Sequence, residues 1–63
     1  MTELTHSLSI DIGGTFTDIV LLDGDTGSVQ VEKTLTTPAA PLDAVRSGIT
    51  GLLARTGVRP EEI

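Results

Sequence analysis

Apolar and polar positions in the first half of the chain predict three β-strands. Residues 8–12 and 29–33 alternate apolar with polar side chains, the period of a strand with one buried face. Residues 17–22 form a more continuous apolar run, which is typical of a strand buried on both faces. A segment with two glycines, 13–16, and an Asp-Gly turn, 23–27, keep both connections short. Strands joined so closely pair antiparallel, so we expect a three-stranded meander.

The second half of the chain predicts one α-helix, because its apolar residues recur at helical spacing and form a single stripe. The stripe consists of Leu42, Val45, Ile49, Leu52 and Leu53. Pro41 suits the first helical turn, where a missing N–H costs nothing, and Gly57 is a natural stop. Gly48 and Gly51 weaken the helix, but their spacing permits close approach to a sheet. Residues 60–62 resemble the start of another short helix.

Together these elements predict an α/β fold that is incomplete. The helix is long enough to cross over to a further strand parallel to the first, and that strand would follow Ile63. A domain of this size buries only about 60% of its unfolded surface. The chain has no cysteine, tryptophan or tyrosine to support a small core. We therefore predict a tail at 1–7 and the start of a larger domain at 8–63, which alone neither unfolds cooperatively nor is active. A free-standing minidomain is the alternative.

Charge and hydropathy exclude two classes of partner. The net charge is −5, and the four basic residues do not cluster, which argues against a nucleic-acid surface. No apolar run approaches the roughly 18 residues of a membrane span. The first residues lack the basic segment and apolar core of a secretory signal. We expect a cytoplasmic protein that binds neither nucleic acid nor membrane.

The strongest candidate site is the turn between the first two predicted strands. Two glycines there are flanked by hydroxyl and carboxylate side chains, namely Asp11, Thr15, Thr17 and Asp18. Glycines let backbone N–H groups approach phosphate oxygens, and threonine hydroxyls donate to the same oxygens. An aspartate at a strand end can hold a hydrated magnesium ion, which takes few protein ligands. The pattern predicts a site for phosphate and a divalent cation.

Structural alternatives for the same residues stay open. Gly13 and Gly14 could form an ordinary hairpin turn, and Asp11 could lie on the solvent face of an edge strand. We expect a structural role for Asp18 and a place in the core or a cleft wall for Phe16. The spacing differs from a P-loop and from a dinucleotide fingerprint, because a strand follows the glycines and no Lys-Ser/Thr does.

At these residues the chain resembles a known family. Residues 11–15, Asp-Ile-Gly-Gly-Thr, resemble the first phosphate motif of the actin-like (ribonuclease H-like) ATPase superfamily. The longer string 11–18, which adds Phe-Thr-Asp, resembles more narrowly the N-terminus of the hydantoinase A/oxoprolinase family. Residues 33–38, Lys-Thr-Leu-Thr-Thr-Pro, resemble that family's third strand and its exit. One departure is Ala40, where an acidic residue is commoner; it concerns the helix cap.

The resemblance implies an enzyme whose nucleotide-binding domain opens with residues 8–63. Members use ATP and magnesium to phosphorylate an amide, lactam or ketone oxygen, which drives ring-opening hydrolysis or carboxylation. Carried over by position, Asp11 faces the metal, Gly13, Gly14 and Thr15 line the phosphates, and Thr17 is a neighbouring polar contact. No residue here is implied to be catalytic. The resemblance also implies a hydantoinase B-like partner subunit or domain, an oligomer and a small cyclic amide, lactam or ketone substrate.

Two other functions fit the shorter motif. A sugar or acetate kinase of the same superfamily shares Asp-x-Gly-Gly-Thr but seldom continues with Phe-Thr-Asp. A regulator that kept the fold without catalysis is the second alternative, and an attached DNA-binding region would favour it.

Overall fold

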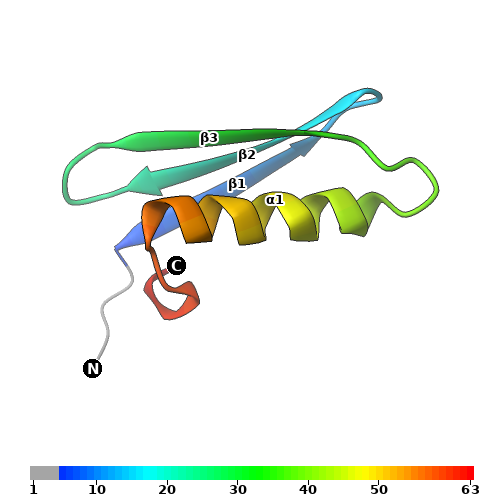
Figure 1. The fold of residues 1–63 in the computed structure, drawn as a ribbon. Coiled ribbons are helices and arrows are strands. Elements are labelled where there is room, and N and C mark those ends of the chain that lie inside the picture. Colours follow the sequence, from blue (N-terminus) through cyan, green and yellow to red (C-terminus); the bar gives the residue numbers. More distant parts are fainter. Residues whose placement is uncertain (1–4) are drawn as a thin grey trace.

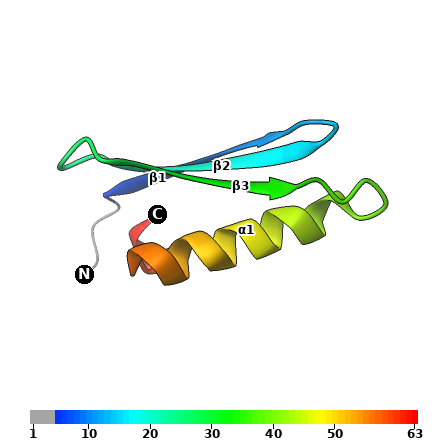
Figure 2. The same cartoon turned by 45° about the horizontal axis from the view of Figure 1, so that its top comes forward.

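The computed structural model describes residues 5–63, and its elements follow the predicted order. Strands β1 (His6–Ile12), β2 (Phe16–Asp23) and β3 (Val29–Leu35) form one antiparallel sheet in the order β1-β2-β3. Helix α1 (Pro41–Thr56) crosses one face of this sheet, and the 3-10 helix η1 (Pro60–Glu62) ends the chain (Figures 1 and 2). The α/β class, the meander and the helix that follows it are confirmed.

The strands extend further than the apolar pattern predicted. β1 begins at His6, two residues before the predicted start, because His6 and Ser7 continue the ladder opposite the end of β2. His6 and Ser7, which we assigned to the tail at 1–7, therefore lie in the first strand. β3 continues past Lys33 to Leu35, which pairs with Phe16. Backbone pairing, which the side-chain pattern does not reveal, sets both ends.

Helix α1 meets the sheet through small residues, and the predicted stripe is only partly right. Ala44, Gly48 and Leu52, spaced four residues apart, are its buried positions. Leu42, which we predicted on the stripe, is 67% exposed. Val45, Ile49 and Leu53 are half-buried beside the contact line. Small side chains at Ala44 and Gly48 let the helix backbone come close to β2 there, whereas Leu52 is a large side chain that is fully buried in the contact.

Gly48 gives the clearest case of this close approach. A Cβ atom added there would overlap Cδ1 of Ile19, a fully buried side chain on β2. At Gly51 the nearest atom to an added Cβ is a carboxylate oxygen of Glu32, at 3.1 Å. The prediction that a glycine permits close helix–sheet packing is confirmed at Gly48.

Replacing each glycine with alanine should separate packing from helix propensity. Both changes gain about 1 kcal/mol of propensity in the helix interior. Gly48→Ala should lose about 1–3 kcal/mol through overpacking against Ile19. Gly51→Ala meets only a flexible carboxylate and should be neutral or stabilising. Urea unfolding of the intact protein measures both; equal free energies of unfolding for the two variants would contradict the packing assignment.

Strand β2 is not buried on both faces, as its continuous apolar run had predicted. Thr17, Ile19 and Leu21 are buried beneath α1, but the alternate residues face away from the helix, and Leu22 among them is exposed. β2 is thus buried on one face within residues 5–63. On β3 the valines Val29 and Val31 share the open face, while Gln30, Glu32 and Thr34 face the helix.

Side chains from neighbouring segments hold the helix ends. Ala40 supplies no capping side chain; instead the Thr37 hydroxyl accepts a hydrogen bond from the Ala44 N–H at 3.1 Å. Gly57 ends the helix in the left-handed conformation, as predicted. Near this end Arg55 donates to the Val31 carbonyl at 3.1 Å and lies 3.6 Å from a Glu32 oxygen. These contacts fix α1 along β3.

Candidate functional site

The turn between β1 and β2 is closed by one backbone hydrogen bond, from the Gly13 N–H to the Phe16 carbonyl at 2.9 Å. Neither Gly13 nor Gly14 has a positive φ, so neither position needs glycine for its backbone conformation. A Cβ at Gly13 would lie 3.0 Å from that carbonyl, whereas a Cβ at Gly14 would meet nothing within 4 Å. The missing side chain at Gly14 therefore leaves open space above the turn.

The turn also carries hydrogen-bond donors without a partner. Within the described residues, the backbone N–H groups of Gly14 and Thr15 and the Thr15 hydroxyl have no hydrogen-bond partner. The Thr15 side chain and both glycines are exposed. Two backbone donors and a hydroxyl without a bulky side chain between them are what a phosphate group requires.

Thr17 is placed differently from its neighbours. Its side chain is fully buried, on the face of β2 that lies under α1. Its hydroxyl hydrogen-bonds the Thr36 hydroxyl at 2.9 Å, and Thr36 in turn donates to the Gly13 carbonyl at 2.8 Å. The Thr36 N–H donates to the Thr15 carbonyl at 2.8 Å. The structure brings Gly13, Gly14 and Thr15 together at the surface and puts Thr17 behind them.

Thr36 also belongs to this candidate site, although the sequence pattern did not indicate it. It follows β3 directly, and because Leu35 pairs with Phe16, the next residue lies opposite the turn. The signal was the pair of threonines at the predicted strand exit, whose position opposite the glycines depends on the register of the meander.

Two carboxylates stand side by side near the turn. Asp11 and Asp18 are cross-strand partners, so both side chains lie on the open face of the sheet. Asp18 lies 3.2 Å from the ammonium of Lys33, its partner on β3. That ammonium also lies 4.9 Å from the centre of the Phe16 ring. Lys33 therefore offsets the charge of Asp18.

Asp11 is exposed and has neither an ion pair nor a hydrogen bond within residues 5–63. Asp11 lies on an edge strand of this sheet, and its exposure agrees with the alternative that it faces solvent there. A carboxylate on the strand that leads into a turn with unpartnered donors would also suit magnesium, which combines one or two carboxylates with phosphate oxygens and waters. No cluster of three potential metal ligands occurs in the described part of the chain. Asp11 would thus offer the hydrated ion a single carboxylate, beside phosphate oxygens and waters.

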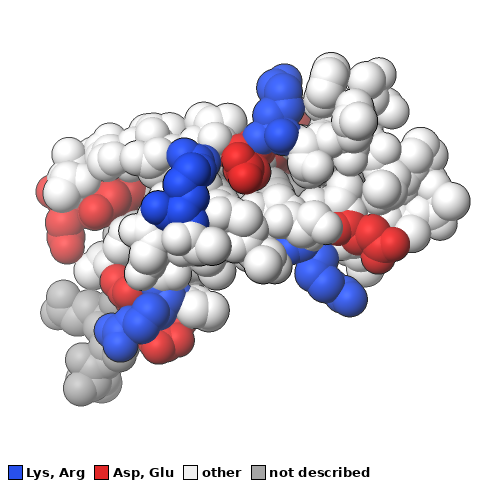
Figure 3. Space-filling model, in the orientation of Figure 1, with Lys and Arg blue, Asp and Glu red and all other residues white. Residues whose placement is uncertain are grey.

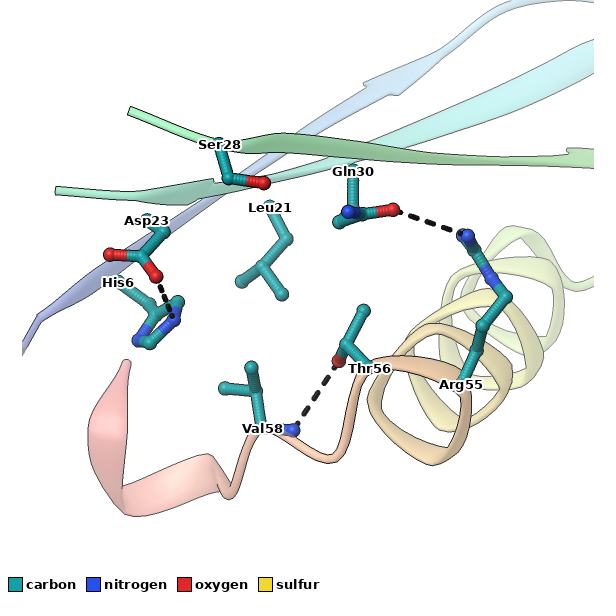
Figure 4. Close-up of a pocket in the computed structure, with 8 residues that line it drawn as sticks. All are labelled: His6, Leu21, Asp23, Ser28, Gln30, Arg55, Thr56 and Val58. Carbon is teal, nitrogen blue, oxygen red and sulfur yellow. Dashed lines mark hydrogen bonds and ion pairs between the residues drawn. The ribbon is translucent and has the colours of Figure 1, made fainter. Parts of the chain in front are cut away.

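A cavity of about 350 Å³ lies at the other end of the sheet, beside the C-terminal end of α1 (Figure 4). It is lined by His6, Leu21, Asp23, Ser28, Gln30, Arg55, Thr56 and Val58. Most of its polar groups pair with one another or with the backbone: His6 lies 3.6 Å from Asp23, and Arg55 donates to Gln30 at 3.4 Å. The negative end of a helix dipole also disfavours phosphate here. The glycine turn is therefore the better candidate for binding phosphate.

Asp23 belongs to the turn between β2 and β3. Its carboxylate accepts hydrogen bonds from the Asp25 and Thr26 N–H groups, at 2.9 and 3.3 Å. These bonds to the charged form lower the pKa of Asp23 below its ordinary value. The interpretation of Asp23 as a turn residue without chemistry agrees with this geometry.

Charges of both signs are interspersed on the face shown in Figure 3, where lysines and arginines do not form one patch. No helix in the described residues is long and apolar enough to cross a membrane. The predictions on nucleic acid and on cytoplasmic location stay predictions.

Comparison with known proteins adds two similarities. Residues 7–63 match a family model described as the hydantoinase/oxoprolinase N-terminal region. Over its 63 residues the chain is 40% identical to caprolactamase subunit alpha of Pseudomonas jessenii, and it spans 9% of that relative's length. No solved structure matches the chain. Both matched regions include Asp11, the glycine turn, Thr17 and Thr36.

Proposed function

Because the chain belongs to the hydantoinase/oxoprolinase family, we propose that it supplies the first phosphate-binding turn of an ATP-dependent cyclic-amide hydrolase. In this proposal residues 8–63 open an actin-like nucleotide-binding domain. The remainder of the enzyme provides the adenine pocket, the substrate site and the catalytic base. The family match disfavours the sugar or acetate kinase and the non-catalytic regulator, both of which we inferred from the shorter motif.

One observation carries the proposal: unpartnered donors and an unpartnered carboxylate occur together at the turn. Gly14 and Thr15 offer backbone N–H groups within the described residues, and Asp11 lies on the strand that leads into the turn. An ordinary hairpin needs neither feature. ATP with magnesium would use both, because the N–H groups bind phosphate oxygens and the carboxylate attracts the hydrated cation.

The residues of this chain would bind and orient the nucleotide. Gly14 keeps the space above the turn open, while the N–H groups of Gly14 and Thr15 fix the position of the phosphate. Asp11 would hold magnesium through its waters, and Lys33 keeps Asp18 from adding a second uncompensated charge. Bound ATP would supply the phosphoryl group that turns an amide oxygen into a leaving group.

The relative suggests the substrate class and the partner. Its name contains a lactam, so among the amide, lactam and ketone substrates that the sequence left open we propose a lactam or related cyclic amide. The name also describes a subunit, so we propose a second, hydantoinase B-like subunit and an oligomeric enzyme. We further propose a cytoplasmic location, where ATP is available.

Lactam hydrolysis by the intact protein with its partner subunit tests this function. With ε-caprolactam as the probe, ring opening should require MgATP, and each ring opened should release one ADP and one phosphate. A lactam labelled with ¹⁸O at the carbonyl should pass the label to the released phosphate. One water adds to the phosphorylated carbon and the ring C–N bond breaks, which gives an acyl phosphate; a second water then attacks the acyl carbon and expels the labelled phosphate. Hydrolysis at an equal rate without ATP would contradict the proposal. The 63-residue chain alone should be inactive.

A further inference from the structure

Thr36 donates to two carbonyl groups of the glycine turn from outside the turn itself. Its hydroxyl donates to the Gly13 carbonyl at 2.8 Å, and its N–H donates to the Thr15 carbonyl at 2.8 Å. Figures 1 and 2 show the segment after β3 at the same end of the sheet as the β1–β2 turn. The turn is therefore held by β3 as well as by its own closing hydrogen bond.

The directions of these bonds follow from the available hydrogens. A threonine hydroxyl has one hydrogen, and the carbonyl of Gly13 can only accept. The Thr36 hydroxyl hydrogen is thus committed to Gly13, so Thr17 must be the donor in the 2.9 Å bond between the two threonines. Thr17, fully buried, has no hydroxyl hydrogen left for a phosphate oxygen. In this arrangement it acts on the turn through Thr36.

The Gly13 carbonyl controls where the Gly14 N–H points. Both groups belong to one peptide unit, which is planar and, here, trans, so the C=O and the N–H point in opposite directions. The Thr36 hydroxyl holds the carbonyl toward the strand exit. The Gly14 N–H is consequently directed away from Thr36, and no described residue accepts a hydrogen bond from it.

We propose that Thr36 is a positioning residue that orients the Gly14 N–H for phosphate, with Thr17 as its buried support. This inference rests on the proposed function, because it assigns a role at the same turn. It explains why two threonines that do not reach the open side of the turn form a continuous hydrogen-bonded chain to its backbone.

Thr36→Val in the intact protein removes the hydroxyl but keeps the shape and the N–H bond to Thr15. The Kd for MgATP should rise about tenfold while kcat changes less than about threefold, as expected for one lost hydrogen bond to the turn. Hydrogen exchange of the segment containing Gly13, whose N–H closes the turn, should become faster. Thr36→Ser should restore both. Thr34→Val, two residues earlier and on β3, is the matched control, because the Thr34 hydroxyl makes no hydrogen bond within residues 5–63.

A double-mutant cycle decides how Thr17 acts. If Thr17 acts through Thr36, Thr17→Val should weaken MgATP binding in the wild type but have little further effect in the Thr36→Val background. Additive losses would instead support a direct phosphate contact by Thr17 and would overturn its supporting role. Unchanged exchange and affinity in Thr36→Val would overturn the positioning role of Thr36. If the wild-type protein does not bind ATP, the proposed function fails, and the exchange measurements still decide whether Thr36 holds the turn.

Discussion

Gly14→Val should abolish ATP use while leaving the fold intact. A Cβ at Gly14 meets no atom of the chain within 4 Å, and the backbone there has no positive φ. The valine should therefore change the stability of the fold little. It would instead obstruct a ligand that approaches the turn. A displaced phosphate loses the in-line geometry of transfer, so we expect kcat/KM for ATP to fall at least about a hundredfold.

Steady-state kinetics and a thermal melt of the intact protein measure the two halves of this prediction. Ala39→Val is the control, because it places the same side chain at another exposed position, in the loop between β3 and α1. Figure 1 shows that loop at the same end of the sheet as the β1–β2 turn. Gly13→Val is a different experiment: its Cβ would lie 3.0 Å from the Phe16 carbonyl, so it should disturb the turn itself. ATP use by Gly14→Val at the wild-type rate would remove the phosphate site from this turn.

Asp11→Asn should make the enzyme depend on much higher magnesium concentrations. The change keeps the shape and one oxygen but removes the charge that attracts the hydrated cation. At low magnesium we expect turnover to fall about 100- to 1,000-fold, the equivalent of several kcal/mol of charge stabilisation. The melting temperature should change little or rise, because Asp11 faces Asp18 across the strand pair and like charges there repel.

A magnesium titration of ATP hydrolysis, run beside a denaturation curve, checks this prediction. Asp18→Asn is the matched control: it removes the partner carboxylate, which is already paired with Lys33. Its stability should fall slightly, and its magnesium requirement should stay at the wild-type value. If Asp11→Asn instead lowers stability by about 1–3 kcal/mol and leaves the magnesium requirement unchanged, Asp11 is a structural acceptor rather than a metal contact.

The apolar pattern was informative wherever local chemistry sets the structure. Alternating side chains predicted β1 and β3, and the glycines and the Asp-Gly turn predicted the two connections. Pro41 and Gly57 predicted the two ends of the helix. The pattern was wrong where the structure depends on how two elements pack against each other. The helix stripe predicted Leu42 in the contact, but the sheet lies against Ala44 and Gly48, since a helix packs closest where its side chains are small.

In the candidate site, too, the sequence determined some features and only the tertiary structure decided the others. Its residue types are local: the sequence by itself determined that Asp11, Gly13, Gly14 and Thr15 lie at one turn, and the tertiary structure left them there at the surface. Only the tertiary structure decided that Thr17 is buried behind the turn, that Lys33 pairs with Asp18 and that Thr36 reaches the Gly13 carbonyl. Each of these contacts joins residues on different strands or at their ends. Their distances depend on the strand register, which backbone hydrogen bonds across the whole sheet set together.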